Sequence, residues 1–491
     1  MGLEPERPFP PGEYDVVVVG SGPGGLQTSY YLRRLGVDHA VISADEGPGG
    51  MFRKWPRFQR LISWTEVDAP VPRESVEYER YDQNSLLADE PELRALVAAR
   101  MGRELVVPSR PEMEEGLQQF TTQAALAVRY GCRWESTRQD ETGFVLETSD
   151  GDYRCRAAVF AIGTTAPWKA AIPGIESVPH YAELQDPTAY VGKRVLVIGK
   201  RNSGFEVGNA LLPWALQLIL VSPQPVRTDV LAHASVRTRY LMPLEVDSVG
   251  GGAFVLDAAI SRIERKTDGY RVWIAGTTQP GEHELVVDEA VVATGFETPL
   301  GDLPALGVKT VAQGRIPALT PYWETTVPGL YVAGNASQGA PELRKHGFGS
   351  ASTSVKGFRY NARLLAGRIA ARLGPGVDRP LASRDTVVPA LSRALARDPA
   401  LWSQKGYLAR AYAFDNGQAR DQGVVPLSAF LDADDPEAVA VAVEVNADGV
   451  IHPTVYVRRA GRLREEEFDP HLLHEFDDEP YRRLLARILD A

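Results

Sequence analysis

Two stretches of the chain share one pattern, in which a run of apolar residues leads into a glycine-rich turn and then into mixed polar and apolar positions. The first, VVVVGSGPGGLQTSYYLRRLG, covers residues 16–36, and the second, RVLVIGKRNSGFEVGNALL, covers 194–212. A short apolar run bounded by glycine indicates a buried strand. We therefore predict two strand–turn–helix–strand units. The first has strands over 14–19 and 40–43 around a helix that ends near residue 35, and the second covers 193–222.

Between and after these units the pattern predicts further helices and hairpins. A helix is expected near 111–130, followed by strands over 144–163 that turn at Asp150-Gly151. The Pro-rich segment 171–187 is expected to be a linker. A strand entering a glycine-containing turn is expected over 328–339, and a long helix over 350–373.

The last part of the chain has a different pattern, which begins after the Gly- and Pro-rich stretch 374–380. Residues 438–459 alternate apolar and other side chains about Asp448-Gly449, which predicts a β-hairpin, and a short helix is expected over 479–491. The predicted organisation is an N-terminal arm (1–13), a discontinuous first nucleotide domain (14–185 and 290–373), a second nucleotide domain (186–289) and a C-terminal α+β domain (374–491).

Composition narrows the possible functions. The chain has 491 residues and a net charge of −11, which argues against a nucleic-acid binder, because such a protein needs a basic face. No signal peptide and no apolar run of membrane-spanning length is apparent, so we expect a cytoplasmic protein that does not bind membranes. The two cysteines, Cys132 and Cys155, form no C-x-x-C motif. A disulfide framework, a metal cluster and a redox-active cysteine pair are therefore not expected.

The first glycine turn has the spacing of a dinucleotide-binding fingerprint. Gly20 permits the tight turn after the strand, Gly22 lets the backbone approach a pyrophosphate, and Gly25 lets the helix pack against the strand. The acidic residue that binds the ribose is expected about 20 residues farther on. Ser43 occupies that position, so either Ser43 contacts the ribose or one of Asp45 and Glu46 reaches it.

The second turn keeps Gly199 and Gly204 but has Arg201 at the middle position. Ser222 stands where the ribose-binding acid is expected, and without an acid there NADPH is favoured over NADH. Lys200, Arg201 and Arg227 are candidates to meet the 2′-phosphate. The alternative is that this domain keeps the fold but binds no dinucleotide. The predicted fold class is α/β, with two Rossmann-like dinucleotide-binding domains and a small C-terminal α+β appendage.

These units, together with FAIGTTAP (160–167) and VVATGFE (291–297), resemble the flavin-containing monooxygenase superfamily. The chain resembles more closely the FAD-dependent oxidoreductase-domain proteins of the endoplasmic reticulum and their bacterial relatives. Three further stretches carry that similarity: FRKWPRFQRLISWTE (52–66), RYDQNSLL (80–87) and VKGFRYNARLLA (355–366). The resemblance covers about residues 14–373 and implies FAD in the first domain and NADPH in the second.

The resemblance also implies roles for individual residues. The residues that would hold FAD are Gly20, Ser21, Gly22, Pro23, Gly24, Gly25, Gly49, Gly50, Phe52, Gly334 and Asn335. GKRNSGFE resembles the family's NADPH turn, which adds Asn202 and Ser203. The monooxygenases place an asparagine over the flavin, where this sequence has Thr65, and His180 alone represents their linker motif.

Other residues have both a functional and a structural interpretation. His346, before the long helix, is a candidate to contact substrate or reduced flavin, or a surface histidine. Arg344 and Lys345 could bind an anionic substrate or form a solvated charge run. Trp55, Trp64 and Trp323 could line the flavin pocket or belong to the core.

The function predicted from this reading is that of an FAD- and NADPH-dependent monooxygenase, with Thr65, His346 and Arg201 as candidate catalytic residues. It would use O₂ to oxygenate a nucleophilic nitrogen, sulfur or carbon of a small molecule, in bacterial specialised metabolism. One alternative is an FAD-dependent oxidase or dehydrogenase that does not oxygenate. Another is a flavin-binding partner protein, whose C-terminal domain docks a carrier or partner protein or forms a homo-oligomer.

Overall fold

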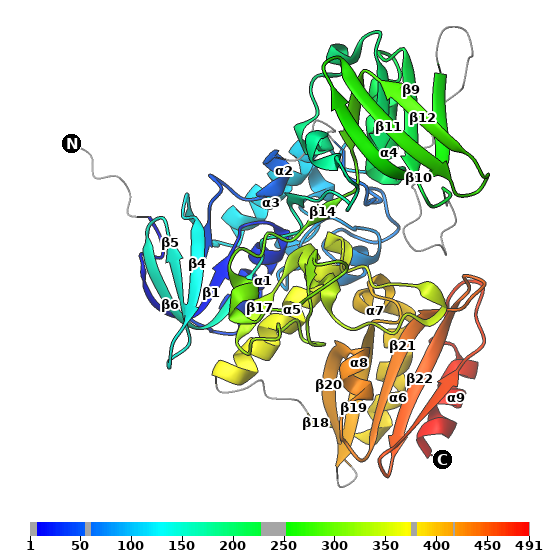
Figure 1. Cartoon of the computed structure of the whole chain (residues 1–491). Helices are drawn as coiled ribbons and strands as arrows, with labels where there is room; N and C mark the ends of the chain where they lie inside the picture. The colour runs from blue at the N-terminus through cyan, green and yellow to red at the C-terminus, as the bar shows by residue number, and fades with distance from the viewer. Residues whose placement is uncertain (1–6, 55–59, 227–251, 375–380, 416–417, 491) are drawn as a thin grey trace. The chain divides into compact units, whose positions relative to one another are not determined.

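The computed structural model describes residues 7–54, 60–226, 252–374, 381–415 and 418–490 (Figure 1). These residues form two compact units. The first takes its described residues from 7–53, 60–164 and 298–490, and the second from Lys54 and 165–297. The chain thus leaves the first unit, builds the second and returns to the first.

The first unit is built on a seven-stranded sheet with apolar side chains on both faces. The strand order is β3-β2-β1-β6-β5-β4, and β17 also pairs with β6. Val16 and Val18 of β1 belong to one buried cluster, and Val17 and Val19 to another. The unbroken valine run is therefore explained by burial on both faces. The strands are β1 (Gly12–Val19), β2 (His39–Ser43), β3 (Arg129–Tyr130), β4 (Trp134–Gln139), β5 (Phe144–Thr148), β6 (Gly151–Phe160) and β17 (Leu330–Val332).

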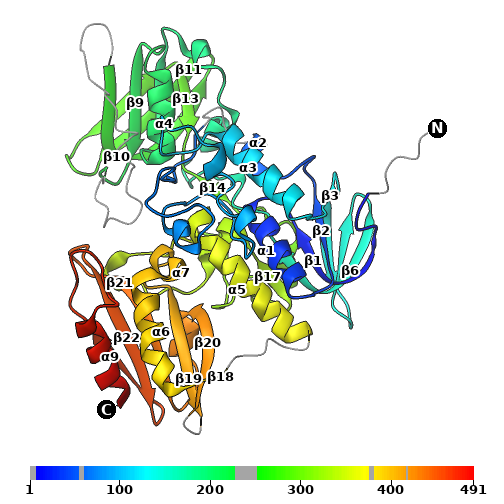
Figure 2. The same ribbon diagram turned by 180° about the vertical axis from the view of Figure 1, so that it is seen from behind.

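Two helices cover one face of this sheet. α1 (Pro23–Arg34) and α5 (Val355–Leu373) pack against each other and share the cluster of Val16 and Val18 (Figure 2). α2 (Met51–Lys54) and α3 (Arg110–Gln123) come from the long segment between β2 and β3. The helix predicted to reach residue 130 ends at Gln123 and is followed by β3. A short hairpin of β15 (Thr310–Val311) and β16 (Ile316–Pro317) precedes β17.

The N-terminal segment expected to be a loose arm is attached to the sheet from residue 7 onward. β1 already begins at Gly12. The Arg7 guanidinium lies 2.9 Å from the Asp150 carboxylate, and the Tyr153 hydroxyl donates to the Phe9 carbonyl over 2.7 Å. Residues 7–13 are therefore part of the first domain.

The second unit repeats the same arrangement on a smaller scale. Its six-stranded sheet has the order β12-β11-β10-β9-β8-β13, and α4 (Asn202–Leu211) follows β8. β8, β9 and β13 are parallel, as is the start of β10 with β9, while β10, β11 and β12 form an antiparallel meander. The strands are β8 (Arg194–Ile198), β9 (Gln217–Ser222), β10 (Gly252–Lys266), β11 (Gly269–Gly276), β12 (Glu282–Val287) and β13 (Glu289–Val292), with a separate pair of β7 (Ala166–Pro167) and β14 (Phe296–Glu297). Both units are Rossmann-like, as predicted.

The Pro-rich segment 171–187 is not a linker, and this prediction was wrong. It forms short 3-10 helices and belongs to the second unit. Ile175, Val178 and Tyr181 are almost completely buried in that unit's core. His180 hydrogen-bonds the Gly295 carbonyl at 3.0 Å and packs on Phe296. The second unit therefore begins at about residue 165, earlier than the predicted 186, and ends near 297.

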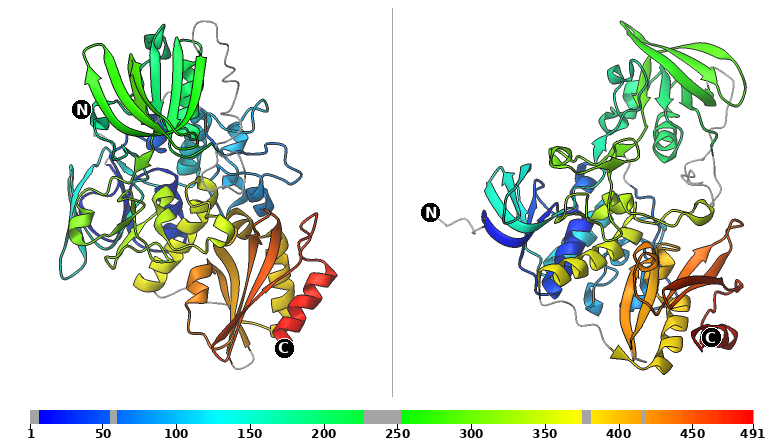
Figure 3. Two further views of the ribbon diagram at one scale, coloured as in Figure 1. Left: turned by 45° about the vertical axis from the view of Figure 1, so that its right-hand side comes forward. Right: turned by 60° about the horizontal axis from the view of Figure 1, so that its bottom comes forward.

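The C-terminal residues form an antiparallel sheet with helices, as the α+β prediction expected (Figure 3). Val439, Val441 and Val443 of β21 face a cluster that includes α6 and α9. The alternating alanines of β21 belong to a second cluster on the other face. The strands, in sheet order, are β18 (Leu381–Ala382), β20 (Gln418–Pro426), β19 (Leu408–Asp415), β21 (Ala438–Val445), β22 (Ile451–Arg459) and β23 (Arg462–Glu467); the helices are α6 (Arg384–Arg397), α7 (Pro399–Ser403), α8 (Leu427–Leu431) and α9 (Glu479–Asp490).

This C-terminal sheet belongs to the same compact unit as the first nucleotide domain, so it is more than an appendage. Buried Gln404 accepts from the Ala351 backbone amide at 2.7 Å and donates to the Asn361 side chain of α5 at 2.9 Å. Asn361 in turn donates to the Ser337 hydroxyl, which lies just beyond β17. A buried polar chain therefore connects the C-terminal domain to the turn after β17.

Among the described residues, no helix is both long and apolar enough to cross a lipid bilayer.

Candidate functional site

The first glycine turn is shaped by two close backbone contacts. Gly20 has φ +112°, and a Cβ there would lie 2.5 Å from the Ala161 carbonyl oxygen. A Cβ on Gly25 would lie 1.9 Å from the Gly20 carbonyl oxygen. Only glycine fits at both positions, which supports the roles predicted from the fingerprint.

Gly22 differs from its neighbours because it faces open space. It is the N-cap of α1, and a Cβ there would meet nothing within 4 Å. α1 has no side-chain cap and no acid in its first turn, whereas Ser109 and Glu112 form a complete capping box on α3. The first-turn amides of α1 therefore remain available to an anion, and the residues present fit the pyrophosphate of a dinucleotide.

The other residues predicted to bind FAD lie around this turn. The Gly49 amide donates to the Ser21 carbonyl at 3.0 Å, which brings Gly49 and Gly50 beside the turn. A Cβ on Gly24 would lie 2.5 Å from Gly334, so the start of α1 touches the turn after β17. Asn335 accepts from the Thr164 amide at 2.8 Å and links the carboxyl ends of β17 and β6. Phe52 is partly buried on α2, and its amide donates to the Gly49 carbonyl.

The three candidates for the ribose contact of the first unit lie in different surroundings. Ser43 is buried, and its hydroxyl lies 2.9 Å from that of Ser21. The Asp45 amide donates to the Ser43 hydroxyl at 3.2 Å, and Glu46 is exposed. Ser43 thus packs beneath the glycine turn through its contact with Ser21, while the side chain of Glu46 faces solvent.

Three stretches that carried the family resemblance meet in one buried network. The Thr65 hydroxyl donates to Asp82 Oδ1 at 2.9 Å and accepts from Asn84 Nδ2 at 2.9 Å. Asn84 also donates to the Ser63 carbonyl. Arg359 of α5 donates to the Ser85 carbonyl at 2.7 Å. Thr65 therefore has its hydroxyl engaged on both sides, which gives it a positioning role within this network.

The second glycine turn has the same backbone contacts as the first. Gly199 has φ +126°, with a Cβ position 2.5 Å from the Ala293 carbonyl oxygen, and a Cβ on Gly204 would lie 2.1 Å from the Gly199 carbonyl oxygen. Arg201 is the N-cap of α4, with φ −104° and ψ −162°, close to the −72° and 177° of Gly22. Its side chain is exposed. The arginine therefore leaves the turn undistorted, and α4 also lacks a side-chain cap and a first-turn acid.

Lys200 is not free to meet a 2′-phosphate, so this prediction is corrected. Its ammonium is buried, donates to the Leu256 carbonyl at 2.9 Å and forms an ion pair with Asp257. The hydrogen bond that the Lys200 ammonium donates to the Asp257 carboxylate lowers the pKa of Asp257. Asp257 lies directly beside Ser222 in the parallel register of β10 and β9. Asn202 and Ser203 lie in the first turn of α4 and are partly buried, and Arg227 lies outside the described residues.

The remaining candidates are placed as follows. His346 is exposed, in the left-handed backbone region with φ +54°, and has no hydrogen-bond partner in the described part of the chain. Lys345 is held by Glu444 and Tyr456 of the C-terminal sheet, at 2.9 Å and 2.7 Å, so it is no solvated charge. Trp323 is fully buried in the core and Trp64 is partly exposed, whereas Trp55 lies outside the described residues.

The two cysteines are separate and buried. Cys132 follows β3 and donates from Sγ to the Thr148 hydroxyl at 3.3 Å, and Cys155 lies within β6. Burial raises the pKa of both thiols, that of Cys155 to about 12. Neither is a thiolate at neutral pH, so this chain offers no cysteine pair for disulfide exchange.

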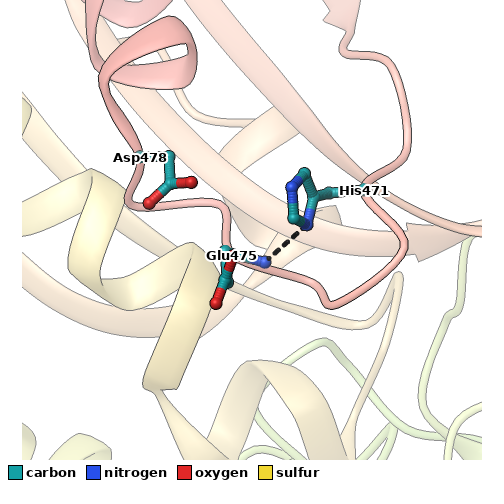
Figure 4. Close-up of side chains that lie close together, drawn as sticks. All are labelled: His471, Glu475 and Asp478. Atoms are coloured by element: carbon teal, nitrogen blue, oxygen red, sulfur yellow. Dashed lines mark hydrogen bonds between the residues drawn. The ribbon is translucent and has the colours of Figure 1, made fainter.

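One group in the described part of the chain has metal-ligand character, namely His471, Glu475 and Asp478 before α9 (Figure 4). The His471 Nδ1 atom accepts from the Leu473 and Glu475 amides, each at 3.2 Å. The imidazole therefore caps this turn, and both carboxylates are exposed. We assign the group a structural role.

A family model for the pyridine nucleotide-disulphide oxidoreductases matches residues 17–334, a span that includes both glycine turns. The chain belongs to this family. It is a flavin-dependent oxidoreductase that uses FAD and a nicotinamide dinucleotide, which agrees with the two uncapped glycine turns. Within the family, this oxidoreductase lacks the cysteine pair to which the family name refers.

Individual relatives of this oxidoreductase have different activities. It is 33% identical over 227 residues to FAD-dependent oxidoreductase domain-containing protein 2 of Danio rerio, a match that covers 45% of the chain and 32% of the relative. The chain thus spans about a third of the length of this relative and of its Mus musculus counterpart. It is 28% identical over 362 residues to a ferredoxin–NADP reductase of Salinispora tropica, covering 70% of the chain and 92% of the relative.

A solved flavin-containing monooxygenase from Stenotrophomonas maltophilia shares the fold of this oxidoreductase. The TM-score is 0.54 at 21% identity, over 73% of the chain and 99% of the monooxygenase. Because the identity is low, this similarity concerns the fold alone.

Several residues of the buried networks could not be assigned from the sequence. Asp82, Asn84 and Arg359 were present in the quoted motifs, but their mutual contacts connect positions far apart in the chain. Gln404 had no sequence signal, because its partners lie on α5 and on the segment before it.

Proposed function

We propose that this protein is an NADPH-dependent FAD monooxygenase that oxygenates a nucleophilic nitrogen, sulfur or carbon of a small molecule, a role that fits bacterial specialised metabolism. The observation that carries the proposal is the pair of matching glycine turns in a chain whose cysteines are separate and buried. Two dinucleotides can be held, and electrons from the flavin need an acceptor other than a protein disulfide. O₂ is such an acceptor.

The overall reaction balances without a further reductant. NADPH, a proton, O₂ and the substrate give NADP⁺, water and the oxygenated substrate. NADPH supplies two electrons, one oxygen atom enters the substrate and the other leaves as water. The bound flavin supplies the redox chemistry, and the protein provides binding, orientation and exclusion of water.

The residues of the chain have defined roles in this proposal. The first-turn amides of α1, reached past Gly22, would hold the FAD pyrophosphate. Gly24 and Gly334 keep α1 and the turn after β17 in contact beside it. Arg201 would meet a phosphate of NADPH from its exposed position, because a planar guanidinium suits such oxyanions.

We place the reaction in the cytoplasm, where two unpaired thiols stay reduced. The substrates are a small molecule and O₂, with no nucleic acid or membrane as partner. The C-terminal domain remains a candidate surface for a carrier protein or a second copy of the chain.

A second candidate function is transfer of electrons from NADPH to an acceptor without oxygenation. The extended similarity to ferredoxin–NADP reductases favours it. Thr65, which replaces the asparagine expected of the monooxygenases, has its hydroxyl engaged by Asp82 and Asn84 and so favours it too.

Anaerobic mixing with NADPH followed by exposure to O₂ tests these functions. Both require NADPH to bleach the visible absorbance of the flavin. The monooxygenase function further requires that a panel of amines, thiols and enolisable carbonyl compounds contains one that takes up isotopically labelled oxygen from O₂. Reduction of added ferredoxin, with no label in any compound, would establish the second candidate. Absence of bleaching would contradict both.

A further inference from the structure

A groove of about 840 Å³ lies within the first unit, between the middle and end of α5 and the C-terminal elements α6, β19 and β20. On α5, the residues that line the groove start at Tyr360. The lining includes no residue of either glycine turn or of the turn after β17. Its volume is in the usual range of small-molecule sites. The groove is therefore separate from the residues that would hold FAD.

Arginines line this groove from both sides. α5 contributes Arg363 and Arg368, α6 contributes Arg393 and Arg397, and β19 contributes Arg410. The acids in the lining are Glu79, Asp398 and Asp421. An excess of arginine here contrasts with the whole chain, whose net charge is −11.

Three of the five arginines have acidic neighbours. Arg410 is paired with Asp421 at 2.5 Å, and Arg397 lies 3.3 Å from Asp477. Arg363 is partly buried, and Glu79 and Asp398 are among the acids that interact with it electrostatically. These contacts account for all three acids of the lining.

Arg368 and Arg393 have no acidic partner in the described part of the chain. Arg368 lies 5.2 Å from the Tyr322 ring, and Arg393 is exposed and makes no hydrogen bond or ion pair there. Two helices thus present unneutralised guanidinium groups to one cavity. Like charges that line one cavity repel each other, and a bound anion would relieve that repulsion. A guanidinium binds phosphate and carboxylate oxygens in a bidentate manner.

The rest of the lining is partly apolar. Leu364 of α5, Ala390 of α6 and Val424 of β20 contribute to the walls. An apolar surface beside two arginines without acidic partners among the described residues matches a ligand with an apolar body and an anionic end. We propose that this groove binds a small amphipathic oxyanion, whose phosphate or carboxylate contacts Arg368 and Arg393 and whose apolar part packs on these walls.

Calorimetric titration of the full-length, FAD-loaded protein saturated with NADP⁺ tests this proposal. The probes are hexyl phosphate, hexanoate and neutral hexanol, and the first two distinguish a phosphate from a carboxylate ligand. We expect saturable binding of at least one anionic probe and none of hexanol. Arg368→Ala and Arg393→Ala should each weaken that binding at least about fivefold, because each removes one charge-assisted contact.

Arg420→Ala is the matched control, because Arg420 is an exposed arginine of β20 outside the lining and its loss changes the net charge equally. It should leave affinity within about twofold. Flavin content and melting temperature should match the wild type in all three variants. The proposal is overturned if neither anionic probe saturates, if hexanol binds as well as the anions, or if Arg420→Ala weakens binding as much as the groove variants. Each result is independent of whether the flavin oxygenates a substrate.

Discussion

Neighbouring glycines of the first turn meet different surroundings, and this separates cofactor binding from folding. A Cβ on Gly22 would meet nothing within 4 Å, whereas a Cβ on Gly24 would lie 2.5 Å from the Gly334 backbone. We expect Gly22→Val to fold normally but to purify without flavin, because its side chain enters the pyrophosphate path. Gly24→Val should be destabilised by about 1–3 kcal/mol through overpacking.

The measurement compares visible flavin absorbance and thermal melting with those of wild-type protein stripped of FAD. Gly22→Val should have the same melting temperature as the stripped wild type, and Gly24→Val should have a lower one. Full flavin content in Gly22→Val would show that the pyrophosphate is bound elsewhere.

Arg201 occupies the middle position of the second turn without distorting it. Its backbone angles are close to those of Gly22, and its side chain is exposed. We expect Arg201→Gly to keep NADPH affinity within about tenfold, or 1.4 kcal/mol, because backbone room is regained as one contact is lost. Arg201→Glu should weaken binding further through repulsion of the phosphates. Stopped-flow reduction of the flavin at several NADPH concentrations gives both affinities, and equal affinities for the two variants would refute a phosphate contact.

The role of a residue could be predicted from the sequence where the backbone conformation allows only one residue type. Gly20 and Gly25 could be assigned because carbonyl oxygens approach too closely for any other residue. Lys200 could not, because its partner Asp257 lies on a strand more than fifty residues away. Thr65 likewise depends on Asp82 and Asn84, whose positions follow from tertiary packing.

At the scale of elements, apolar runs identified the buried strands and the β21–β22 hairpin correctly. The segment 171–187 was wrongly predicted to be a linker, because its prolines suggested an exposed connection. Its apolar residues Ile175, Val178 and Tyr181 are spaced by three, which suits the 3-10 turns that bury them. Proline there shapes the turns without excluding the segment from the core.

The edge of the second sheet offers a pH-dependent test of strand pairing. Asp288 precedes β13 and accepts from the Arg194 backbone amide and guanidinium at the start of β8, at 2.7–3.1 Å. The hydrogen bond from the Arg194 side chain lowers the pKa of Asp288 to about 2. We expect Asp288→Asn to lower the free energy of unfolding by about 1 kcal/mol at neutral pH, after solvent screening of this partly exposed pair.

Because folding lowers the pKa of Asp288, the pair with Arg194 stabilises the protein at neutral pH and loses this effect in acid. The stabilisation is complete above the unfolded pKa of about 3.9 and is lost as the pH falls through the folded pKa. Urea unfolding of wild type and Asp288→Asn should therefore differ at neutral pH and converge in acid. Glu282→Gln, at an exposed position of β12 on the opposite edge of this sheet, is the control and should show no such trend. A difference that stays constant down to acid pH would mean that the charge is not its cause.

The whole molecule departs most from the sequence prediction at its C-terminal part. Residues 374–380 have the composition of a domain boundary, but the domain beyond them completes the first unit. Ala400, Tyr407 and Leu408 lie in the same buried cluster as Val16 of β1. Arg80 stacks on Trp402 at 4.4 Å and donates to the Ala396 carbonyl. Local composition cannot report such contacts, because they join residues more than three hundred positions apart.

Splitting the chain tests this integration. A fragment that ends at Gly374 would expose the apolar surface that Ala400, Tyr407 and Leu408 cover, and would leave Asn361 without Gln404. We expect the fragment alone to aggregate or to lose FAD, because the affected network reaches Ser337 in the turn after β17. Co-expression with a second fragment that starts at Leu381 should restore soluble, yellow protein, since buried contacts rather than the connecting segment hold the parts together. Gel filtration with flavin absorbance measures both outcomes, and a soluble first fragment with its full flavin would show that the C-terminal domain is separable after all.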